Sequence, residues 1–504
     1  MVVRQNHQPP LPTVTKSTIL TIGFTLLLKD KQIFKGEPLC PKMRTPVPGP
    51  MSKRLKEDLG KIQECGAVEF FADYDRSRGN FIFDVDNNLM LDFHNQLGTN
   101  PLGYNHPAFT EVLRNPEFQS SFVNRPSLGL FPPRDHVRRL KTTLMSVAPQ
   151  GLTNVHTFSG GTTAVEFGLK AMFMLYQINK RGSPYPTQEE MASCLRGHKP
   201  GTPDLSILSF NNAFHGRTMG ALALTHNRWE FKVDLPQPNW PVADFPQMQY
   251  PLNEHEIDNI KEEVRCLEMV KNLFETYKKN GSPVAGIVCE PIQSEGGDNY
   301  ASPIFFQGLQ DIAKENGACL MMDEVQTGCG VTGRFWAHEH LYLREPPDVV
   351  AFGKKMVIAG IYLRPELRPQ QPARIFNTWL GDPAKLALCS AVLEVIEKEK
   401  LVNNAHACGV YLLTELENVQ KQNPTVLSRV RGLGLLASVD FPTTKIRNMV
   451  VERLRELGVN AGISGKYSMR VRPTLTIGRQ HVDIFIDTLR HVIKDLRFRR
   501  AFDD

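Results

Sequence analysis

The chain has 504 residues, of which 41% are hydrophobic and 22% are charged, and its formal net charge is +6. This length predicts two or three domains, and the composition is typical of a soluble globular protein. The small positive charge and the lack of a Lys- and Arg-rich block argue against a nucleic-acid-binding protein. The nine cysteines form no Cys-x-x-Cys pair and no zinc-site spacing. We therefore expect no metal site, and buried free thiols in a reducing compartment.

The first 45 residues are expected to be a leader or a disordered tail. Residues 1–29 contain no acidic residue, and their apolar run from Ile19 to Leu28 is too short to cross a bilayer. An acid-poor segment with Ser and Thr is compatible with a mitochondrial transit peptide, although arginine is scarce in it. Two alternatives stay open: a protein of the mitochondrial matrix, or a cytoplasmic protein with a disordered tail.

A repeating pattern of apolar runs and helical stretches begins near residue 154. Before it, a helix is predicted over residues 52–65, and two short strands flank a turn in Phe81–Asp92. The later apolar runs predict the strands Val155–Phe158, Leu205–Phe210, Val284–Cys289, Cys319–Met322 and Val349–Phe352. The stretches between them predict the helices Thr163–Ile178, Glu256–Tyr277 and Pro303–Asn316. This alternation predicts an α/β fold with a large, mostly parallel sheet, whose ligands gather at the carboxyl ends of the strands.

The pattern changes after Gly381, where a smaller α+β domain is predicted. Residues 384–420 indicate a long helix or a helix pair, and residues 481–500 indicate a closing helix. Between them, the strands Val430–Asp440 and Met469–Leu475 flank the helix Ile446–Leu457. We therefore divide the folded part into an N-terminal segment (46–100) that packs with the small domain, a large domain (101–380) and a small domain (381–504).

The turn Ser159-Gly-Gly-Thr-Thr163 lies between a predicted strand and a predicted helix. Glycine allows close approach of the backbone, and a helix N-terminus offers free N–H groups, so the turn can bind a phosphate. A purely steric need for glycine is the alternative. The stretch lacks the Gly-Lys-Ser/Thr of a P-loop, which argues against a nucleoside triphosphate.

Two more polar turns follow predicted strands. Phe214 and Arg217 lie close together after one strand, and they can stack on a ring and bind a carboxylate. A packed Phe and a surface Arg are the alternative. Glu290 and Glu295 follow the strand that ends at Cys289. They can anchor a cation or tune a neighbouring group, or they can belong to a solvated loop.

The last two turns carry a carboxylate and an amine. Asp323 ends one apolar run, and Lys354 and Lys355 end the next. Asp323 can pair with a protonated pyridine nitrogen, and a partly desolvated lysine can condense with an aldehyde. Pyridoxal phosphate (PLP) needs both groups. Val325 can pack on the ring and Gln326 can reach its phenolic oxygen, whereas a solvated surface position is the alternative for either lysine.

Three of these stretches resemble signatures of the class III (ω-amino acid) PLP-dependent aminotransferases. They are Phe214-His-Gly-Arg-Thr, Glu290-Pro-Ile-Gln-Ser-Glu-Gly-Gly and Asp323-Glu-Val-Gln-Thr-Gly. Other stretches are similar to the branch of this family that acts on 4-aminobutyrate in animals. They are Phe122-Val-Asn-Arg-Pro, Phe335-Trp-Ala-His-Glu-His, Arg374-Ile-Phe-Asn-Thr-Trp-Leu-Gly-Asp-Pro and Arg470-Val-Arg-Pro-Thr-Leu. The resemblance runs from about Pro46 to the C-terminus.

The resemblance implies a fold-type I homodimer with its active sites at the subunit interface. It identifies Lys354 as the Schiff-base lysine, because Asn377-Thr378-Trp379 then lies at the spacing found in the family. The other cofactor-binding residues implied are Asp323 for the pyridinium, Val325 and Phe214 for the ring faces, Gln326 for the phenolic oxygen, Glu290 in the adjoining loop, Gly161 and Thr162 for the phosphate, and Thr378 of the partner subunit for the same phosphate.

The resemblance also implies the reaction. PLP-dependent transamination of 4-aminobutyrate, β-alanine or 3-amino-2-methylpropanoate with 2-oxoglutarate is expected, and with 4-aminobutyrate it gives succinate semialdehyde and glutamate. Arg217 is expected to bind the carboxylate of the ω-amino acid, and Arg470 the α-carboxylate of 2-oxoglutarate or glutamate. Glu295 is expected to pair with Arg470 for 4-aminobutyrate and to swing away for glutamate. Lys354, Asp323 and Glu295 are the expected catalytic residues, and no membrane or nucleic-acid partner is expected.

Some positions depart from the family pattern. Animal members carry an iron–sulfur cluster on two cysteines where this chain has Gly160 and Thr163, so we expect no cluster. Val165 replaces an Asn beside the phosphate turn, and Ile358 and Ala359 replace Thr and Gly in what is expected to be a tight turn after the lysines. Two alternatives stay open. One is another ω-aminotransferase with ornithine-like or aromatic donors. The other is an inactive PLP-binding paralogue that serves as a dimer partner, which Val165 and Ala359 motivate.

Overall fold

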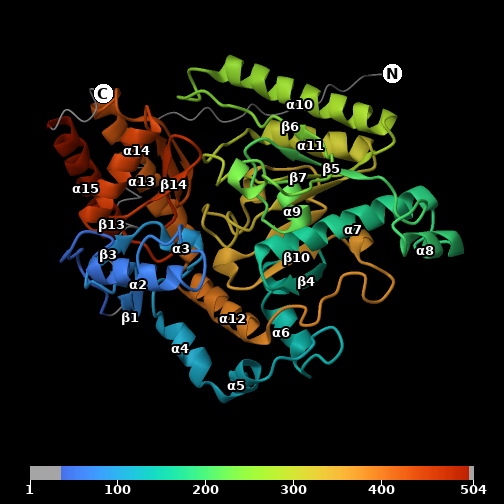
Figure 1. Ribbon diagram of the computed structural model, residues 1–504, viewed down its shortest axis with the longest axis horizontal. Helices are drawn as coiled ribbons and strands as arrows, with labels where there is room; N and C mark the ends of the chain where they lie inside the picture. Colours follow the sequence, from blue (N-terminus) through green and yellow to red (C-terminus); the bar gives the residue numbers. More distant parts are fainter. Residues whose placement is uncertain (1–35, 499–504) are drawn as a thin grey trace, which may run out of the picture.

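A computed structural model describes residues 36–498, so the first 35 residues, which include most of the predicted leader, lie outside the described part. Three sheets organise the described residues (Figure 1). The largest sheet has seven strands in the order β4-β10-β9-β8-β7-β5-β6. They are β4 (Asn154–Phe158), β5 (Ser206–Phe210), β6 (Val242–Ala243), β7 (Val284–Cys289), β8 (Cys319–Asp323), β9 (Val349–Phe352) and β10 (Ala359–Leu363).

The centre of the seven-stranded sheet is parallel. The strands from β9 through β8, β7 and β5 to β6 run parallel to their neighbours, whereas β10 is antiparallel to both β9 and β4. Every residue of β7, β8 and β9 is buried, as expected for strands that are covered on both faces. The predicted α/β fold with a mostly parallel sheet is confirmed, although β6 and β10 were not predicted.

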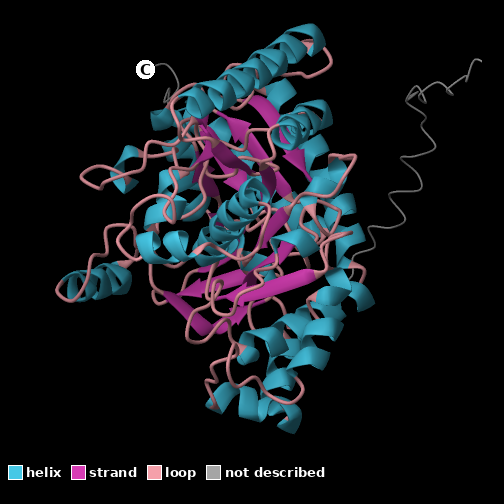
Figure 2. Cartoon of the chain, turned by 90° about the vertical axis from the view of Figure 1, so that its right-hand side faces the viewer, coloured by secondary structure: helices cyan, strands magenta, loops and turns pink. Residues whose placement is uncertain are grey.

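Helices surround the strands of this sheet (Figure 2). They are α7 (Gly161–Arg181), α8 (Gln188–Cys194), α9 (Met219–Ala223), α10 (Glu256–Lys279) and α11 (Pro303–Glu315). Ser302 caps α11 by accepting a hydrogen bond from the N–H of Phe305, and Pro303 occupies its first turn. Gly182 ends α7 in the left-handed conformation. No helix within residues 36–498 has both the length and the apolar character to span a membrane.

The C-terminal region forms a second, four-stranded sheet in the order β11-β12-β15-β14. Its strands are β11 (Ser428–Leu433), β12 (Leu436–Asp440), β14 (Gly462–Ser464) and β15 (Ser468–Val471). Its helices are α12 (Pro383–Lys398), α13 (Leu401–Gln422), α14 (Thr444–Glu456) and α15 (Arg479–Phe498). The stretch predicted as one strand, Val430–Asp440, is two strands, because Gly434 adopts a positive φ of 57° and turns the chain.

The N-terminal segment forms the third sheet together with a strand from the C-terminal region. Its strands are β1 (Ala72–Arg78), β2 (Phe81–Asp84) and β3 (Leu89–Asp92), and β3 pairs in parallel with β13 (Val459–Asn460). The helices before the large sheet are α2 (Pro50–Gly60), α3 (Asn95–Gly98), α4 (Pro107–Arg114), α5 (Pro116–Val123) and α6 (His136–Thr142). Short 3-10 turns are η1 (Met145–Val147), η2 (Trp229–Phe231), η3 (Ala337–His340), η4 (Lys354–Met356) and η5 (Pro365–Leu367).

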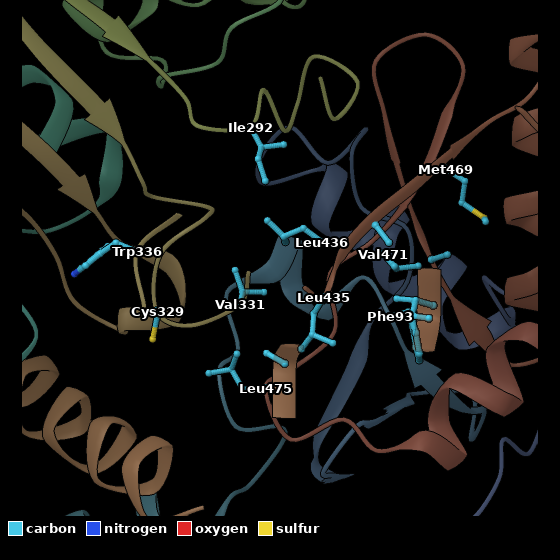
Figure 3. Close-up of a cluster of buried hydrophobic side chains, with 14 of the residues drawn as sticks. Phe93, Ile292, Cys329, Val331, Trp336, Leu435, Leu436, Met469, Val471 and Leu475 are labelled. Carbon is cyan, nitrogen blue, oxygen red and sulfur yellow. The ribbon is translucent and has the colours of Figure 1, made fainter. Parts of the chain in front are cut away.

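A shared hydrophobic core connects these parts (Figure 3). Phe93 from the N-terminal segment, Val331 from the loop after β8, and Leu435 and Val471 from the C-terminal region are all buried in this core. The N–H of Leu435 also donates to the carbonyl of Val331 at 2.9 Å. The core therefore fixes β15, which carries Arg470, beside the loops that follow β7 and β8.

Candidate active site

The phosphate-type turn lies at the start of α7. Gly160 is extended and Gly161 is the first helical residue, so the N–H groups of the first turn have no partner within the helix. A Cβ on Gly161 would lie 2.6 Å from Cγ1 of Val325, so glycine lets the helix start approach the loop after β8. The hydroxyl of Thr162 accepts a hydrogen bond from the N–H of Arg217 at 3.3 Å. Four predicted site residues, Gly161, Thr162, Arg217 and Val325, therefore lie in neighbouring loops.

Asp323 lies at the carboxyl end of β8 and is bound to a histidine. Its Oδ2 lies 2.8 Å from Nδ1 of His215, and its Oδ1 accepts a hydrogen bond from the N–H of Val325 at 3.1 Å. Asp323 and His215 are both buried. Burial acts to lower the pKa of His215, but the nearby Asp323 and Glu290 outweigh it and raise that pKa. Sequence reasoning missed the role of His215, although it lies inside the stretch that drew attention to Phe214 and Arg217.

Glu290 binds backbone rather than another side chain. Its two carboxylate oxygens accept hydrogen bonds from the N–H of Phe214 at 3.0 Å and the N–H of Ser294 at 3.1 Å. Burial raises the pKa of Glu290 to about 7, an increase that the charge of His215 opposes. Glu290 thus ties the loop that carries Phe214 to the loop that carries Glu295.

The two neighbouring lysines have different surroundings. Nζ of Lys354 donates to the carbonyl of Leu97 at 3.1 Å, and burial lowers the pKa of Lys354 to about 8, against the opposing charge of Glu295. Nζ of Lys355 donates to the carbonyls of Pro473 at 3.0 Å and Asn100 at 3.3 Å. Lys355 is buried, and burial lowers its pKa to about 7. The charges of Lys354 and Glu295 each shift the pKa of the other.

Glu295 forms an ion pair with Arg470. Its Oε1 lies 2.8 Å from Nη2 of Arg470 and accepts a hydrogen bond from Gln326 at 3.3 Å. Burial acts to raise the pKa of Glu295, but the charges of Arg470 and Lys354 and these hydrogen bonds lower it to about 2. The side-chain carbonyl oxygen of Gln326 accepts a hydrogen bond from Nε of Arg472 at 2.9 Å. Arg470 on β15 and Arg472 directly after it therefore hold Glu295 and Gln326 together.

Arg217 and Thr378 form no hydrogen bond or ion pair with the Glu295–Arg470 pair or its hydrogen-bond partners. Arg217 is exposed, and its guanidinium lies 4.1 Å from the ring centre of Phe231 and 5.3 Å from that of Phe214. Among residues 36–498 no carboxylate forms an ion pair with Arg217. Thr378 is exposed in the segment between β10 and α12, and it takes no part in the contacts described above.

The two departures from the family pattern have different consequences. Val165 lies on α7 and is buried in the hydrophobic core that this helix helps to form. The expected tight turn at Ala359 is wrong: Ala359 is the first residue of β10 and pairs with Phe158. The left-handed residues of the turn are Lys354, at φ 44°, and Val357, at φ 63°. The methyl group of Ala359 therefore enters a strand, where an L-residue is not strained.

These residues fit PLP. The free N–H groups at the start of α7 suit a phosphate, and the buried carboxylate of Asp323 suits a protonated ring nitrogen. Val325 and Phe214 provide apolar surfaces, and the amine of Lys354 has a lowered pKa, as a lysine that condenses with an aldehyde requires.

Comparisons with known proteins agree with this fit. A family model described as aminotransferase class-III matches residues 62–493. The mitochondrial 4-aminobutyrate aminotransferases of Mus musculus and Homo sapiens are each 47% identical to the chain, over 91% of this chain and 91% of each relative. The 4-aminobutyrate aminotransferase of Dictyostelium discoideum is 45% identical over 92% of this chain and 93% of its own length.

Solved structures show the same fold. A lysine aminotransferase from M. tuberculosis superimposes with a TM-score of 0.79 at 29% identity, covering 88% of this chain and 99% of that chain. The ornithine aminotransferase of Toxoplasma gondii ME49 gives a TM-score of 0.72 at 20% identity over 96% and 100%. The chain therefore belongs to the class III aminotransferases, PLP-dependent transaminases of fold-type I.

Proposed function

We propose that this chain transfers the amino group of 4-aminobutyrate to 2-oxoglutarate, giving succinate semialdehyde and glutamate. The observation that carries the proposal is the Glu295–Arg470 ion pair, together with the unpaired guanidinium of Arg217. A monocarboxylate donor needs one cation, which Arg217 offers while Glu295 neutralises Arg470. A dicarboxylate needs two cations, and it gains the second when Glu295 leaves Arg470. The names of the relatives support the same substrate.

The residues of the chain divide the chemical work. PLP, when bound, supplies an electron sink for the carbon that carries the substrate amine. Asp323 would hold a proton at the ring nitrogen, and the contact with His215 orients Asp323 for this role. Val325 and Phe214 would cover the ring and exclude water from it. Lys354, with a pKa near 8, has a large neutral fraction near that pH, so its Nζ can accept a proton from the substrate carbon and return it.

We also propose that Lys354, and not Lys355, binds the cofactor covalently. The amine of Lys355 is buried and donates to two backbone carbonyls, so its release would break both hydrogen bonds. The carbonyl of Asn100 would keep its hydrogen bond from Nδ2 of Asn95, whereas the carbonyl of Pro473 would lose the donor at 3.0 Å. The amine of Lys354 has one such contact and shares its charge environment with Glu295, Arg470 and Asp323. The carboxylate of Glu290 accepts a hydrogen bond from the N–H of Phe214. We propose that this bond positions Phe214 against the cofactor.

A homodimer is the proposed assembly. Exposed apolar side chains gather on α5 and the loops near it, where Val123, Leu130, Phe131 and Trp379 are 81%, 64%, 77% and 48% exposed. Such a surface is typical of a protein–protein interface. Thr378, exposed next to Trp379, would then reach the phosphate site of the other subunit. The proposed domains stay as divided above, and the pairing of β3 with β13 supports packing of residues 46–100 with the small domain.

We propose the mitochondrial matrix as the compartment. Animal relatives that are 45–47% identical are named as mitochondrial, and the acid-poor first 29 residues are compatible with a transit peptide. Import of the full chain fused to a fluorescent protein into mitochondria, compared with a chain that starts at residue 36, tests this proposal.

A panel of amino donors with 2-oxoglutarate tests the substrate. The PLP-loaded protein should form glutamate with 4-aminobutyrate, and Lys354→Ala should form none while Lys355→Ala retains activity. β-Alanine and 3-amino-2-methylpropanoate are further donors that carry an ω-amine and a carboxylate. If ornithine or an aromatic amine is the better donor, another ω-aminotransferase is indicated. If the wild type is as inactive as Lys354→Ala with every donor, the inactive-paralogue alternative holds.

A further inference from the structure

A cavity of ≈ 880 Å³ opens beside the active site. Glu295, which binds Arg470, lines this cavity and so connects it to the site. The other walls come from the loop of residues 226–230, the start of α14, and the hairpin between β14 and β15. This cavity, which borders the ion pair of Glu295 with Arg470, is called the outer chamber.

The cations of this chamber exceed the carboxylates that neutralise them. Arg429 and Arg431 both pair with Asp440, and Glu295 pairs with Arg470. The other charged side chains that line the chamber, outside these ion pairs, are Arg228, Glu230, Arg447 and Lys466. Three cations thus face one carboxylate, and the chamber carries an excess of positive charge.

Arg447 is the most unusual of these cations, because it is 4% exposed and has no carboxylate partner among residues 36–498. Its Nε donates to the side-chain oxygen of Asn448 at 3.0 Å, and its Nη1 donates to the carbonyl of Gly465 at 3.2 Å. Burial and the nearby charge of Arg228 lower the pKa of Arg447. A buried guanidinium is normally paired with a carboxylate, so Arg447, with the exposed Arg228 near it, leaves room for an anion.

The backbone at the start of α14 also favours an anion in the chamber. Arg447 lies in the first turns of α14, a helix of 13 residues whose start is capped by the hydroxyl of Thr443. Thr444, the first helical residue, lines the chamber. The N-terminus of a helix carries a partial positive charge and free N–H groups, which favour an anion at the same place.

We propose that Arg447, Arg228 and the start of α14 form an outer carboxylate-binding subsite that captures the dicarboxylate substrate before it reaches Arg470. This inference rests on the proposed function. A positively charged chamber concentrates a dianion such as 2-oxoglutarate more strongly than a zwitterionic donor with no net charge. The subsite therefore favours the acceptor half of the reaction, and it is separate from the inner cations Arg217 and Arg470.

The test measures binding without turnover. Glutarate, a dicarboxylate with no keto or amino group, is titrated by calorimetry against the PLP-loaded full chain. All proteins in this test carry Arg217→Gln as the background. This substitution removes the inner cation that has no carboxylate partner among residues 36–498, and it keeps the ion pair of Arg470 with Glu295. Into this background Arg447→Gln and Arg228→Gln are introduced separately. Arg453→Gln is the matched control, since Arg453 lies on the same helix but pairs with Glu456 and Asp495.

Glutarate should bind the background protein and the Arg453→Gln control with equal affinity, and should bind about tenfold more weakly to each of the other two, which corresponds to one lost charged contact. Arg228 is exposed, so Arg228→Gln should fold normally. Its affinity for glutarate therefore tests the subsite even if Arg447→Gln does not fold. Equal affinity in all four proteins would overturn the subsite. Tighter binding of inorganic phosphate than of glutarate would overturn its assignment to a carboxylate. If glutarate binds as expected but the wild type transaminates nothing, only the proposed function fails.

Discussion

Oε1 of Glu295 lies 2.8 Å from Nη2 of Arg470, although the two residues are 175 positions apart in the chain. Gln326 donates to the same oxygen and itself accepts a hydrogen bond from Arg472, which directly follows β15. Glu295 therefore neutralises the charge of Arg470 in this structure. In the proposed function, the second carboxylate of a dicarboxylate substrate competes with Glu295 for Arg470, whereas Arg217 is available to either substrate.

The first prediction compares these two arginines. Arg217→Gln should impair both half-reactions, because both substrates use this cation. Arg470→Gln should impair the 2-oxoglutarate half-reaction by about hundredfold, or ~2.7 kcal/mol, and the 4-aminobutyrate half-reaction far less. Single-turnover kinetics of each half-reaction measure the two effects. Equal losses in both half-reactions of Arg470→Gln would contradict the separate roles.

The second prediction concerns His215. His215→Phe removes the side chain 2.8 Å from Asp323 and leaves a buried carboxylate with one partner fewer. An unpaired buried polar group costs about 1–3 kcal/mol, so PLP affinity should fall about tenfold or more. His226→Phe is the control, since His226 contacts Ser209 instead. Titration of the apoprotein with PLP by absorbance measures the affinity, and unchanged affinity in His215→Phe would contradict the role.

The third prediction concerns the pH dependence of stability. Burial lowers the pKa of Lys355 to about 7 from its usual value of 10.5. Between these two pH values the unfolded chain holds a proton that the folded chain has released. The free energy of unfolding therefore rises with pH in this window, by at most about 1.4 kcal/mol per pH unit for this group.

Lys355→Met keeps the side-chain length and removes the titration. The wild type should gain stability relative to this variant as the pH rises from 7 towards 10.5, and the difference should be flat below pH 7. Urea unfolding of both proteins across this range measures the difference. A difference that does not change with pH would show that the amine of Lys355 is not buried in the neutral form.

The fourth prediction concerns the turn after the lysines. Val357 is β-branched and holds a φ of 63°, a strained conformation for such a residue. Val357→Gly should raise the free energy of unfolding by about 1 kcal/mol, because glycine relieves this strain. Ala359→Gly should lower it by about 0.5–1 kcal/mol, because Ala359 lies in β10 and glycine weakens a strand. Thermal unfolding of both variants checks this ordering, and the reverse order would place the strain at Ala359.

The sequence alone predicted the parts of the fold that are locally encoded. β7, β8 and β9 are continuous apolar runs because both of their faces are covered, and such runs are visible without a structure. β10 (Ala359–Leu363) was missed because it begins directly after the lysine turn, and the sequence analysis expected its first residue, Ala359, to lie in that turn. β6 has two residues, too few for a periodic signal.

Within the site, residue types and loop positions were predictable, but contacts across the chain were not. The pairing of Asp323 with His215 spans 108 positions, and the contact of Lys354 with the carbonyl of Leu97 spans 257. Leu97 lies in a left-handed turn at φ 59°, a conformation for which its sequence carries no signal. Such contacts depend on how the three sheets pack, and no local pattern records that packing.

Glu295→Gln tests the central claim most directly, because it removes the charge that neutralises Arg470 and keeps the shape of the side chain. Single-turnover rates of the PLP-loaded variant are measured with 4-aminobutyrate and with glutamate, with Glu315→Gln as an exposed control. The account predicts that the rate with 4-aminobutyrate falls about tenfold or more, because Arg470 then competes for its carboxylate, while the rate with glutamate is retained. Equal changes with both substrates, or a selective loss with glutamate, would contradict it.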